Sequence, residues 1–238
     1  MENKNKNNKE NKTKKTENKR KTPIGIDDQQ IDKNKSAQKL FKSAKRFANL
    51  NELELALENI EEALSIDTVD DDDYNQADAY FLATQICRRA KEYTMALKFV
   101  EEGIKTVNPY RPDGPKFVLA KGVTLLQLAD AKSGGSKRKK HLDKAIDSFK
   151  MAVTVSEVLL NQKVEYRFEP KDISTIKRYL TVAIYDSAYA NDLLGNRRQA
   201  IEALDRLFEF DPHFSVPDST FELYHKIRDE KRVLHIAK

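Results

Sequence analysis

One spacing of small and apolar residues recurs four times along this chain, and it constrains the fold more than any other feature. Each copy begins with an alanine and places small or apolar residues four, seven and eight positions later. The four sets are Ala56, Ile60, Ala63 and Leu64; Ala96, Val100, Gly103 and Ile104; Ala145, Phe149, Ala152 and Val153; and Ala200, Leu204, Leu207 and Phe208. These offsets lie on one face of an α-helix. The spacing therefore predicts an all-α chain in which similar helices stack side by side.

A second helix is expected before each copy. Ala44 and Ala188 stand twelve residues before Ala56 and Ala200, where a small side chain lets two helices lie close together. Thr84 holds the same place in the second copy. Five of the seven prolines fall between the apolar-periodic segments, where they end or begin helices. Together these signals predict nine helices, at 36–49, 52–66, 74–91, 94–107, 115–132, 139–160, 171–194, 197–210 and 217–235.

The recurring positions resemble those of the tetratricopeptide repeat family, whose units are helix-turn-helix pairs of about 34 residues. The matching residues are Leu40, Ala44, Phe47, Ala56, Ile60 and Ala63 in the first unit; Tyr80, Cys87, Tyr93, Ala96, Val100 and Gly103 in the second; Val118, Gly122 and Leu125 in the third; and Ala188, Gly195, Ala200, Leu204, Leu207 and Pro212 in the fourth. The resemblance implies a right-handed superhelical array of about four antiparallel helix pairs, closed by a half-polar C-terminal capping helix.

The chain also departs from that family. The leading alanines are 40, 49 and 55 residues apart, which is longer than the family repeat. We therefore expect a divergent array with lengthened helices and loops. The excess in the third unit carries the segment DAKSGGSKRKKH, in which we expect a loop with a flexible Ser-Gly-Gly. This loop would present a basic cluster made of Lys137, Arg138, Lys139 and Lys140.

The first 34 residues are predicted to be a disordered Lys- and Asn-rich tail and linker, and 35–238 the repeat domain. Residues 1–22 carry nine Lys or Arg and three Glu, a net charge of +6, whereas the whole chain carries +5. The repeat domain is therefore close to neutral, and its charge does not indicate nucleic-acid binding. Because the tail lacks apolar residues, we expect it to be dispensable for folding. One short segment, Val164 to Phe168, alternates like an extended piece and could cover a neighbouring helix.

No pattern in the sequence indicates catalysis, a cofactor or a metal. The four histidines have no partners at metal-ligand spacing, and no glycine-rich phosphate loop is present. Cys87 falls at an inward repeat position and is expected in the core. The four aspartates from Asp70 to Asp73 lack the spacing of a calcium loop and are expected to cap the next helix. With one cysteine and no secretory signal, the expected location is the cytoplasm, where peripheral association with a membrane-bound complex stays open.

The family resemblance implies that the first helix of each pair lines an inner groove that holds a protein or peptide. The groove residues it implies are Phe41, Lys45, Phe81, Gln85, Arg88, Arg89, Lys116, Tyr185 and Tyr189. One end of the groove would be basic, and the other would be acidic through Asp186 and Asp192. Family members that clasp the acidic tails of chaperones use a fixed Lys and Asn set. Phe41, Leu82 and Ala120 stand where several of those polar groups would be, which argues against this ligand class.

These features favour a non-enzymatic adaptor or scaffold. An assembly factor for one subunit of a secretion or motility apparatus is an alternative, and it would show a single stoichiometric client. Another alternative is a binder of nucleic acid or anionic membrane through the tail and Lys137–Lys140, which would show steep salt dependence. The absence of interleaved aromatic residues makes nucleic acid the weaker of these partners.

Overall fold

The computed structural model describes residues 28–68, 74–131, 134–161, 168–216 and 219–236, and nine helices lie within them. The helices are α1 (Asp28–Asn49), α2 (Leu53–Ser65), α3 (Gln76–Arg89), α4 (Tyr93–Thr106), α5 (Gly114–Asp130), α6 (Gly135–Asn161), α7 (Pro170–Leu193), α8 (Arg197–Phe210) and α9 (Glu222–Ile236). No strand occurs within these residues. Three predicted features lie outside the described residues. They are the tail at 1–22, the four aspartates from Asp70 to Asp73, and the Val164–Phe168 segment apart from Phe168.

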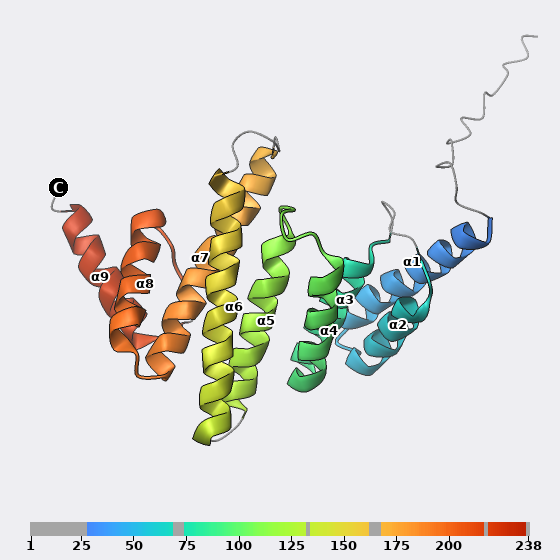
Figure 1. Cartoon of the computed structure of the whole chain (residues 1–238), viewed down its shortest axis with the longest axis horizontal. Coiled ribbons are helices and arrows are strands. Elements are labelled where there is room, and N and C mark those ends of the chain that lie inside the picture. Colours follow the sequence, from blue (N-terminus) through green and yellow to red (C-terminus); the bar gives the residue numbers. More distant parts are fainter. Residues whose placement is uncertain (1–27, 69–73, 132–133, 162–167, 217–218, 237–238) are drawn as a thin grey trace, which may run out of the picture.

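Consecutive helices pack as pairs, and the pairs follow one another in a row. The closest partners are α1 with α2, α3 with α4, α5 with α6, and α7 with α8, and α9 closes the row against α8 (Figure 1). Leu223, Tyr224 and Ile227 of α9 are buried, as is Phe221 directly before this helix, as a capping helix requires. This arrangement confirms the all-α array of antiparallel helix pairs.

The predicted repeat register is also confirmed. Ala56, Ala96, Ala145 and Ala200 are completely buried, and each begins the apolar face of the second helix in its pair. The facing small residues of the first helices, Ala44, Thr84 and Ala188, are completely buried as well. Close helix contact therefore depends on small side chains at these positions.

The turns within three of the four helix pairs share one backbone geometry. Asn51, Lys91 and Gly195 each precede the leading alanine of their pair by five residues, and each has a positive φ, of 63°, 63° and 79°. In each turn the next backbone N–H donates to a carbonyl five residues earlier, as in Glu92 to Cys87 at 2.8 Å. This is the pattern that ends a helix on a left-handed residue, which glycine adopts most easily. Only the fourth pair has glycine there.

The third pair differs, and here the loop expectation is wrong. Helix α6 begins at Gly135 and runs for 27 residues, about 40 Å, so the extra sequence lengthens helices instead of forming a loop. Lys137, Arg138, Lys139 and Lys140 belong to the first two turns of α6. Figure 1 shows α5 and α6 reaching beyond their neighbours at one end.

The first helix also begins earlier than predicted. Residues 28–34, expected to belong to the linker, form the first two turns of α1, and Asn34 is buried. The Gln30 side chain donates to the Asp67 backbone carbonyl at 3.0 Å, which ties this end of α1 to the segment after α2. A tertiary contact of this kind leaves no periodic signal in the sequence.

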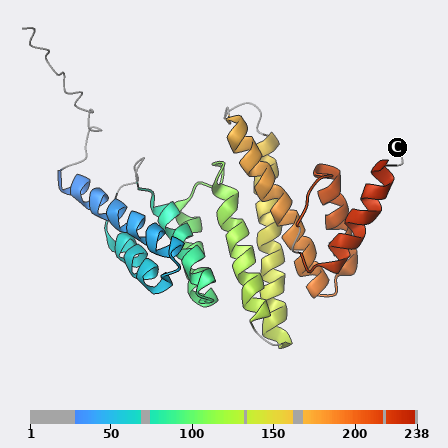
Figure 2. The ribbon, with the colours of Figure 1, turned by 180° about the vertical axis from the view of Figure 1, so that it is seen from behind.

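The two helices of each pair occupy different layers. Helix α3 contacts both α1 and α5, and α5 contacts α7, whereas α2, α4, α6 and α8 do not contact one another within the ordered residues. The layer of first helices is therefore the tighter one and forms the inner surface of the row. Figure 2 shows this layer facing the viewer.

Candidate partner-binding groove

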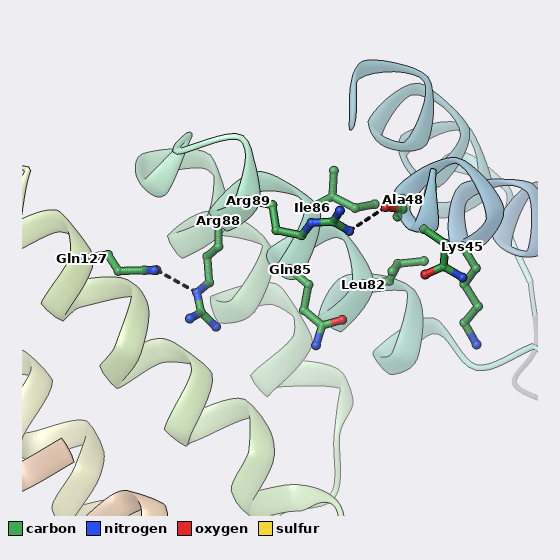
Figure 3. A pocket seen from close by; sticks show the side chains of 9 residues that line it. Lys45, Ala48, Leu82, Gln85, Ile86, Arg88, Arg89 and Gln127 are labelled. Atoms are coloured by element: carbon green, nitrogen blue, oxygen red, sulfur yellow. Dashed lines mark hydrogen bonds between the residues drawn. The ribbon is translucent and has the colours of Figure 1, made fainter. Parts of the chain in front are cut away.

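A cleft of about 660 Å³ lies on the inner surface between α1, α3 and α5 (Figure 3). Its lining residues are Lys45, Ala48, Asn49, Leu82, Gln85, Ile86, Arg88, Arg89 and Gln127. Three of these side chains are cationic, and none is acidic. Leu82, Ile86 and Ala48 supply an apolar floor, so the cleft offers apolar contact together with positive charge.

Arg88 is held in place by a neighbouring helix. The Arg88 Nε atom donates to Gln127 Oε1 of α5 at 2.8 Å, an interaction visible in Figure 3. Burial lowers the pKa of Arg88, while the negative charge of Asp186 on α7 raises it. The guanidinium remains charged at any physiological pH. Its Nη atoms have no acceptor among the residues that the structure describes, which leaves them available to a ligand.

Arg89 and Lys45 differ in whether their charged groups are held by hydrogen bonds within the chain. Arg89 donates to the Ala48 carbonyl at 2.6 Å and to Asn51 Oδ1 at 3.0 Å, so it satisfies the C-terminal end of α1. The Lys45 ammonium lies 4.2 Å from the centroid of the Phe41 ring. Arg89 therefore has a structural role, whereas Lys45 is an exposed charge at the rim of the cleft.

Phe41 does not contribute to the groove surface, and its expected exposure is wrong. The side chain is only 7% exposed and packs edge to face against the buried Tyr74, with ring centroids 5.9 Å apart. A phenylalanine on the first helix can turn toward the neighbouring pair, and here that contact buries it.

Lys116 and Phe81 lie together at the α3–α5 junction. The Lys116 ammonium is 2.8 Å from Asp78 and 3.2 Å from Asp113, and it lies 5.1 Å from the Phe81 ring centroid. Burial lowers the pKa of Lys116, but the hydrogen bonds and charges of Asp78 and Asp113 outweigh it and the net shift is upward. Lys116 is thus neutralised within the chain. Phe81 packs edge to face on the buried Phe117, so truncating it would cost stability.

Tyr185 and Tyr189 serve the C-terminal cap. Tyr185 packs against Tyr224 with ring centroids 5.2 Å apart, and Tyr189 packs against Phe221 at 5.3 Å. The Tyr185 hydroxyl also shares a hydrogen bond with Ser219. Both tyrosines are half-buried, and they join α7 to the start of α9.

Asp186 is a half-buried carboxyl on α7 that forms no hydrogen bond with the residues that the structure describes. Burial raises its pKa to about 7, and the charge of Arg88 opposes this shift. Arg88 and Asp186 influence each other electrostatically but form no ion pair in the part of the chain that is described.

The other predicted features have simpler surroundings. Lys137, Lys139 and Lys140 are exposed, and Arg138 is half-buried and acts electrostatically on Asp130. Cys87 is completely buried, and burial raises the pKa of its thiol to about 12, which confirms its place in the core. Helix α3 is capped by Asn75, whose side chain accepts from the Ala77 N–H at 2.8 Å.

Two features are absent from the residues that the structure describes. No group of three or more His, Cys, Asp or Glu side chains gathers there as metal ligands. No helix there is long and apolar enough to cross a membrane.

Several residues of the cleft are absent from the groove set that the resemblance implies. They are Ala48, Asn49, Leu82, Ile86 and Gln127. Gln127 stands 38 residues after Arg89, as Lys116 stands 38 residues after Asp78. Continuing the spacing of α3 into α5 would therefore have included Gln127.

The residues that the structure describes define an all-helical repeat array with a cationic cleft on its inner surface. No protein-family model matches the sequence, and no curated protein matches it. One similar solved structure is YrrB, described as a TPR protein with an unusual peptide-binding site. It is 17% identical, the match covers 85% of this chain and 95% of that chain, and the TM-score is 0.35. The fold assignment therefore rests on the helix pairing and buried register shown above.

Proposed function

We propose that this chain is a non-enzymatic adaptor that holds a segment of a partner protein in the inner groove, centred on the cleft between α1, α3 and α5. The observation that carries the proposal is the cleft itself, which combines an apolar floor with three cationic side chains. Apolar contact surrounded by polar groups is the usual composition of a protein-binding surface.

The rim and floor of the cleft suit an extended segment. Gln85 and Lys45 are exposed and can contact a backbone or side chain, while Leu82 and Ile86 can accept an apolar side chain. The Arg88 Nη donors can bind a carboxylate or a carbonyl oxygen. Arginine is among the residues that dominate binding energy at interfaces.

The rival basic surface is testable against the groove. Lys137, Lys139 and Lys140 are exposed on the first turns of α6, well placed for phosphate or an acidic surface. Binding through them would be strongly reduced by salt. A variant that alters the groove must therefore be compared with a variant that removes the positive charges of this cluster.

The experiment has two stages. First, a photo-crosslinking amino acid is placed at Gln85 in the groove, and at Lys98 on the outer helix α4 as the control, and the partner cross-linked in native lysate is identified by mass spectrometry. Second, the affinity of that partner is measured for Arg88→Glu and for the variant with Lys137 to Lys140 all changed to Ser. Phe81 is left unchanged, because its contact with Phe117 would confuse binding with stability.

We expect cross-linking at Gln85 only, and an affinity loss of about tenfold or more for Arg88→Glu at a temperature where its helical circular dichroism matches that of the native chain. The Ser variant should bind normally. If the Ser variant loses binding while Arg88→Glu retains it, the groove proposal is wrong and the basic surface takes its place. A single stoichiometric client would favour the assembly-factor form of the proposal.

A further inference from the structure

We propose that the cleft between α1, α3 and α5 selects an internal segment of the partner in which two acidic side chains flank an apolar one. One carboxylate binds Arg88, the other binds Lys45, and the apolar side chain packs on Leu82 between them. This inference rests on the proposed function, and it adds the chemical class of the segment that the groove holds.

The floor of the cleft has one apolar side chain that a ligand can cover. Leu82 is half-buried, whereas Ile86 and Ala48, which also line the floor, are only 1% and 4% exposed. In Figure 3, Leu82 lies between Lys45 on α1 and Arg88 on α3. A polar side chain placed against Leu82 would lose its water without gaining a hydrogen bond. The floor therefore favours an apolar residue of the partner, with a cation on each side of it.

Arg88 is the stronger of the two anchors, because it is half-buried and oriented. Its Nε atom donates to Gln127 Oε1 at 2.8 Å, which fixes the plane of the guanidinium, and its Nη atoms donate to no residue that the structure describes. The charge of Asp186 acts on Arg88 electrostatically, but the two groups form no ion pair within the described residues. A carboxylate can form two parallel hydrogen bonds with an oriented guanidinium.

Lys45 is the weaker anchor, because its ammonium is exposed. It lies 4.2 Å from the centroid of the Phe41 ring and forms no ion pair with a residue that the structure describes. Arg89 adds a third positive charge, although its own hydrogen bonds go to the end of α1. The described residues that line the cleft include no acidic side chain. The negative charge that balances these cations is therefore expected from the ligand.

The inner surface does not end at Arg88, because α5 and α7 continue the row beyond it. A bound chain can therefore run on past the guanidinium, so the acidic groups we infer are side chains and not a terminal carboxylate. Lys45 and Arg88 carry the same charge, so the segment can lie in either direction. What the cleft selects is an acidic residue on each side of an apolar one.

The test selects random peptides displayed on phage against the full-length protein. A selected peptide is synthesised with an amidated C-terminus, so that its only carboxylates are those of its side chains. Two further peptides replace one or the other acidic residue with the matching amide. Fluorescence anisotropy gives the affinities for the native chain, for Arg88→Gln and Lys45→Gln, and for the control Lys98→Gln on the exposed face of α4.

We expect the native chain and Lys98→Gln to select acidic residues on both sides of an apolar residue. One amide replacement should weaken binding to the native chain about tenfold, and the other about twofold, since an exposed ion pair contributes less. Arg88→Gln should no longer distinguish the first acid from its amide, and Lys45→Gln should no longer distinguish the second. If each variant keeps the native preference for acid over amide, the inference is wrong.

Gln127 provides a second test of the Arg88 anchor, which also serves if Arg88→Gln does not fold. Gln127→Glu places a carboxylate beside the guanidinium within the chain, so it should compete with the ligand and weaken the acidic peptide about tenfold. Gln127→Met removes the hydrogen bond without adding charge, and it should weaken binding less. Equal affinities of the two variants would contradict a carboxylate at Arg88.

The failure of the proposed function gives a different result. Gln85→Trp fills the cleft, so it should abolish selection if peptides bind there. Peptides that are lost with Gln85→Trp but show no enrichment of acidic residues, or bind as well as their amides, overturn only this inference. If no peptide is enriched, or if enrichment survives Gln85→Trp, both proposals are wrong.

Discussion

At the scale of single residues, the groove shows how a shared position can serve either structure or binding. Arg88 and Arg89 are adjacent in sequence and both line the cleft. Arg89 donates its hydrogen bonds to the end of α1, whereas the Arg88 Nη atoms donate to no residue that the structure describes. The difference arises from which helix each side chain meets, which the residue type does not reveal.

The carboxyl of Asp186 makes stability depend on pH. Because burial raises its pKa to about 7 from an ordinary value near 3.8, the folded chain binds more protons than the unfolded chain between those values. Stability from this group is fully present below the unfolded pKa and is lost as pH rises through about 7.

Asp186→Asn should therefore raise the free energy of unfolding at pH 8 by on the order of 1–3 kcal/mol and have little effect at pH 4. Urea unfolding of both proteins across this range measures the difference. Asp192→Asn on the same helix serves as the control. An equal effect of Asp186→Asn at both pH values would show that this carboxyl is not desolvated.

Lys91 is a second residue-scale test, because it adopts a left-handed conformation with a φ of 63°. The left-handed conformation costs a non-glycine residue about 1–2 kcal/mol. Glycine removes this cost, but it also increases the conformational entropy of the unfolded chain, which offsets part of the gain. Lys91→Gly should stabilise the chain by about 0.5–1 kcal/mol in urea unfolding. Lys98→Gly, within the exposed part of α4, should instead destabilise it. If Lys91→Gly also destabilises, the common turn geometry is wrong.

At the scale of helices, the small residues that recur in each repeat determine where the two helices of a pair contact each other. Ala200 begins the buried face of α8 and is completely buried against α7. Ala200→Leu should overpack this contact and lower the free energy of unfolding by about 1–3 kcal/mol. Thermal and urea unfolding measure the change, and Gln199→Leu at the exposed neighbouring position should be nearly neutral. Equal stability of Ala200→Leu and the native chain would contradict the register.

Helix existence and register were predictable because they depend on a local period. Ala44, Ala56 and Ala200 could be assigned to buried positions from spacing alone, and they are completely buried. The start of α1 could not be predicted in this way, because the Gln30 contact with Asp67 joins segments far apart in the sequence. The conformation of the extra residues in the third pair could not be predicted either, since both a loop and longer helices would accommodate them.

The groove was predictable in position but less so in composition. Spacing placed Lys45, Gln85 and Arg88 on the inner surface, and all three line the cleft. It also placed Phe41 and Lys116 there, but one is buried by Tyr74 and the other is paired with Asp78. Those outcomes depend on contacts between neighbouring pairs, and a period within one helix carries no information about them.

At the scale of the whole molecule, the central claim is that the inner surface of the first helices holds the partner. The layer of α1, α3, α5 and α7 is continuous, and its cleft between α1, α3 and α5 carries three cationic side chains. The outer helices offer no corresponding continuity, since they do not contact one another within the ordered residues.

Hydrogen–deuterium exchange with a bound peptide or partner tests this claim most directly. We expect slower exchange in the segments of α3 and α5 that carry Gln85, Arg88 and Gln127, and unchanged exchange in α2, α4 and the first turns of α6. Slower exchange confined to the turns that carry Lys137–Lys140, or to the outer helices, would contradict the account.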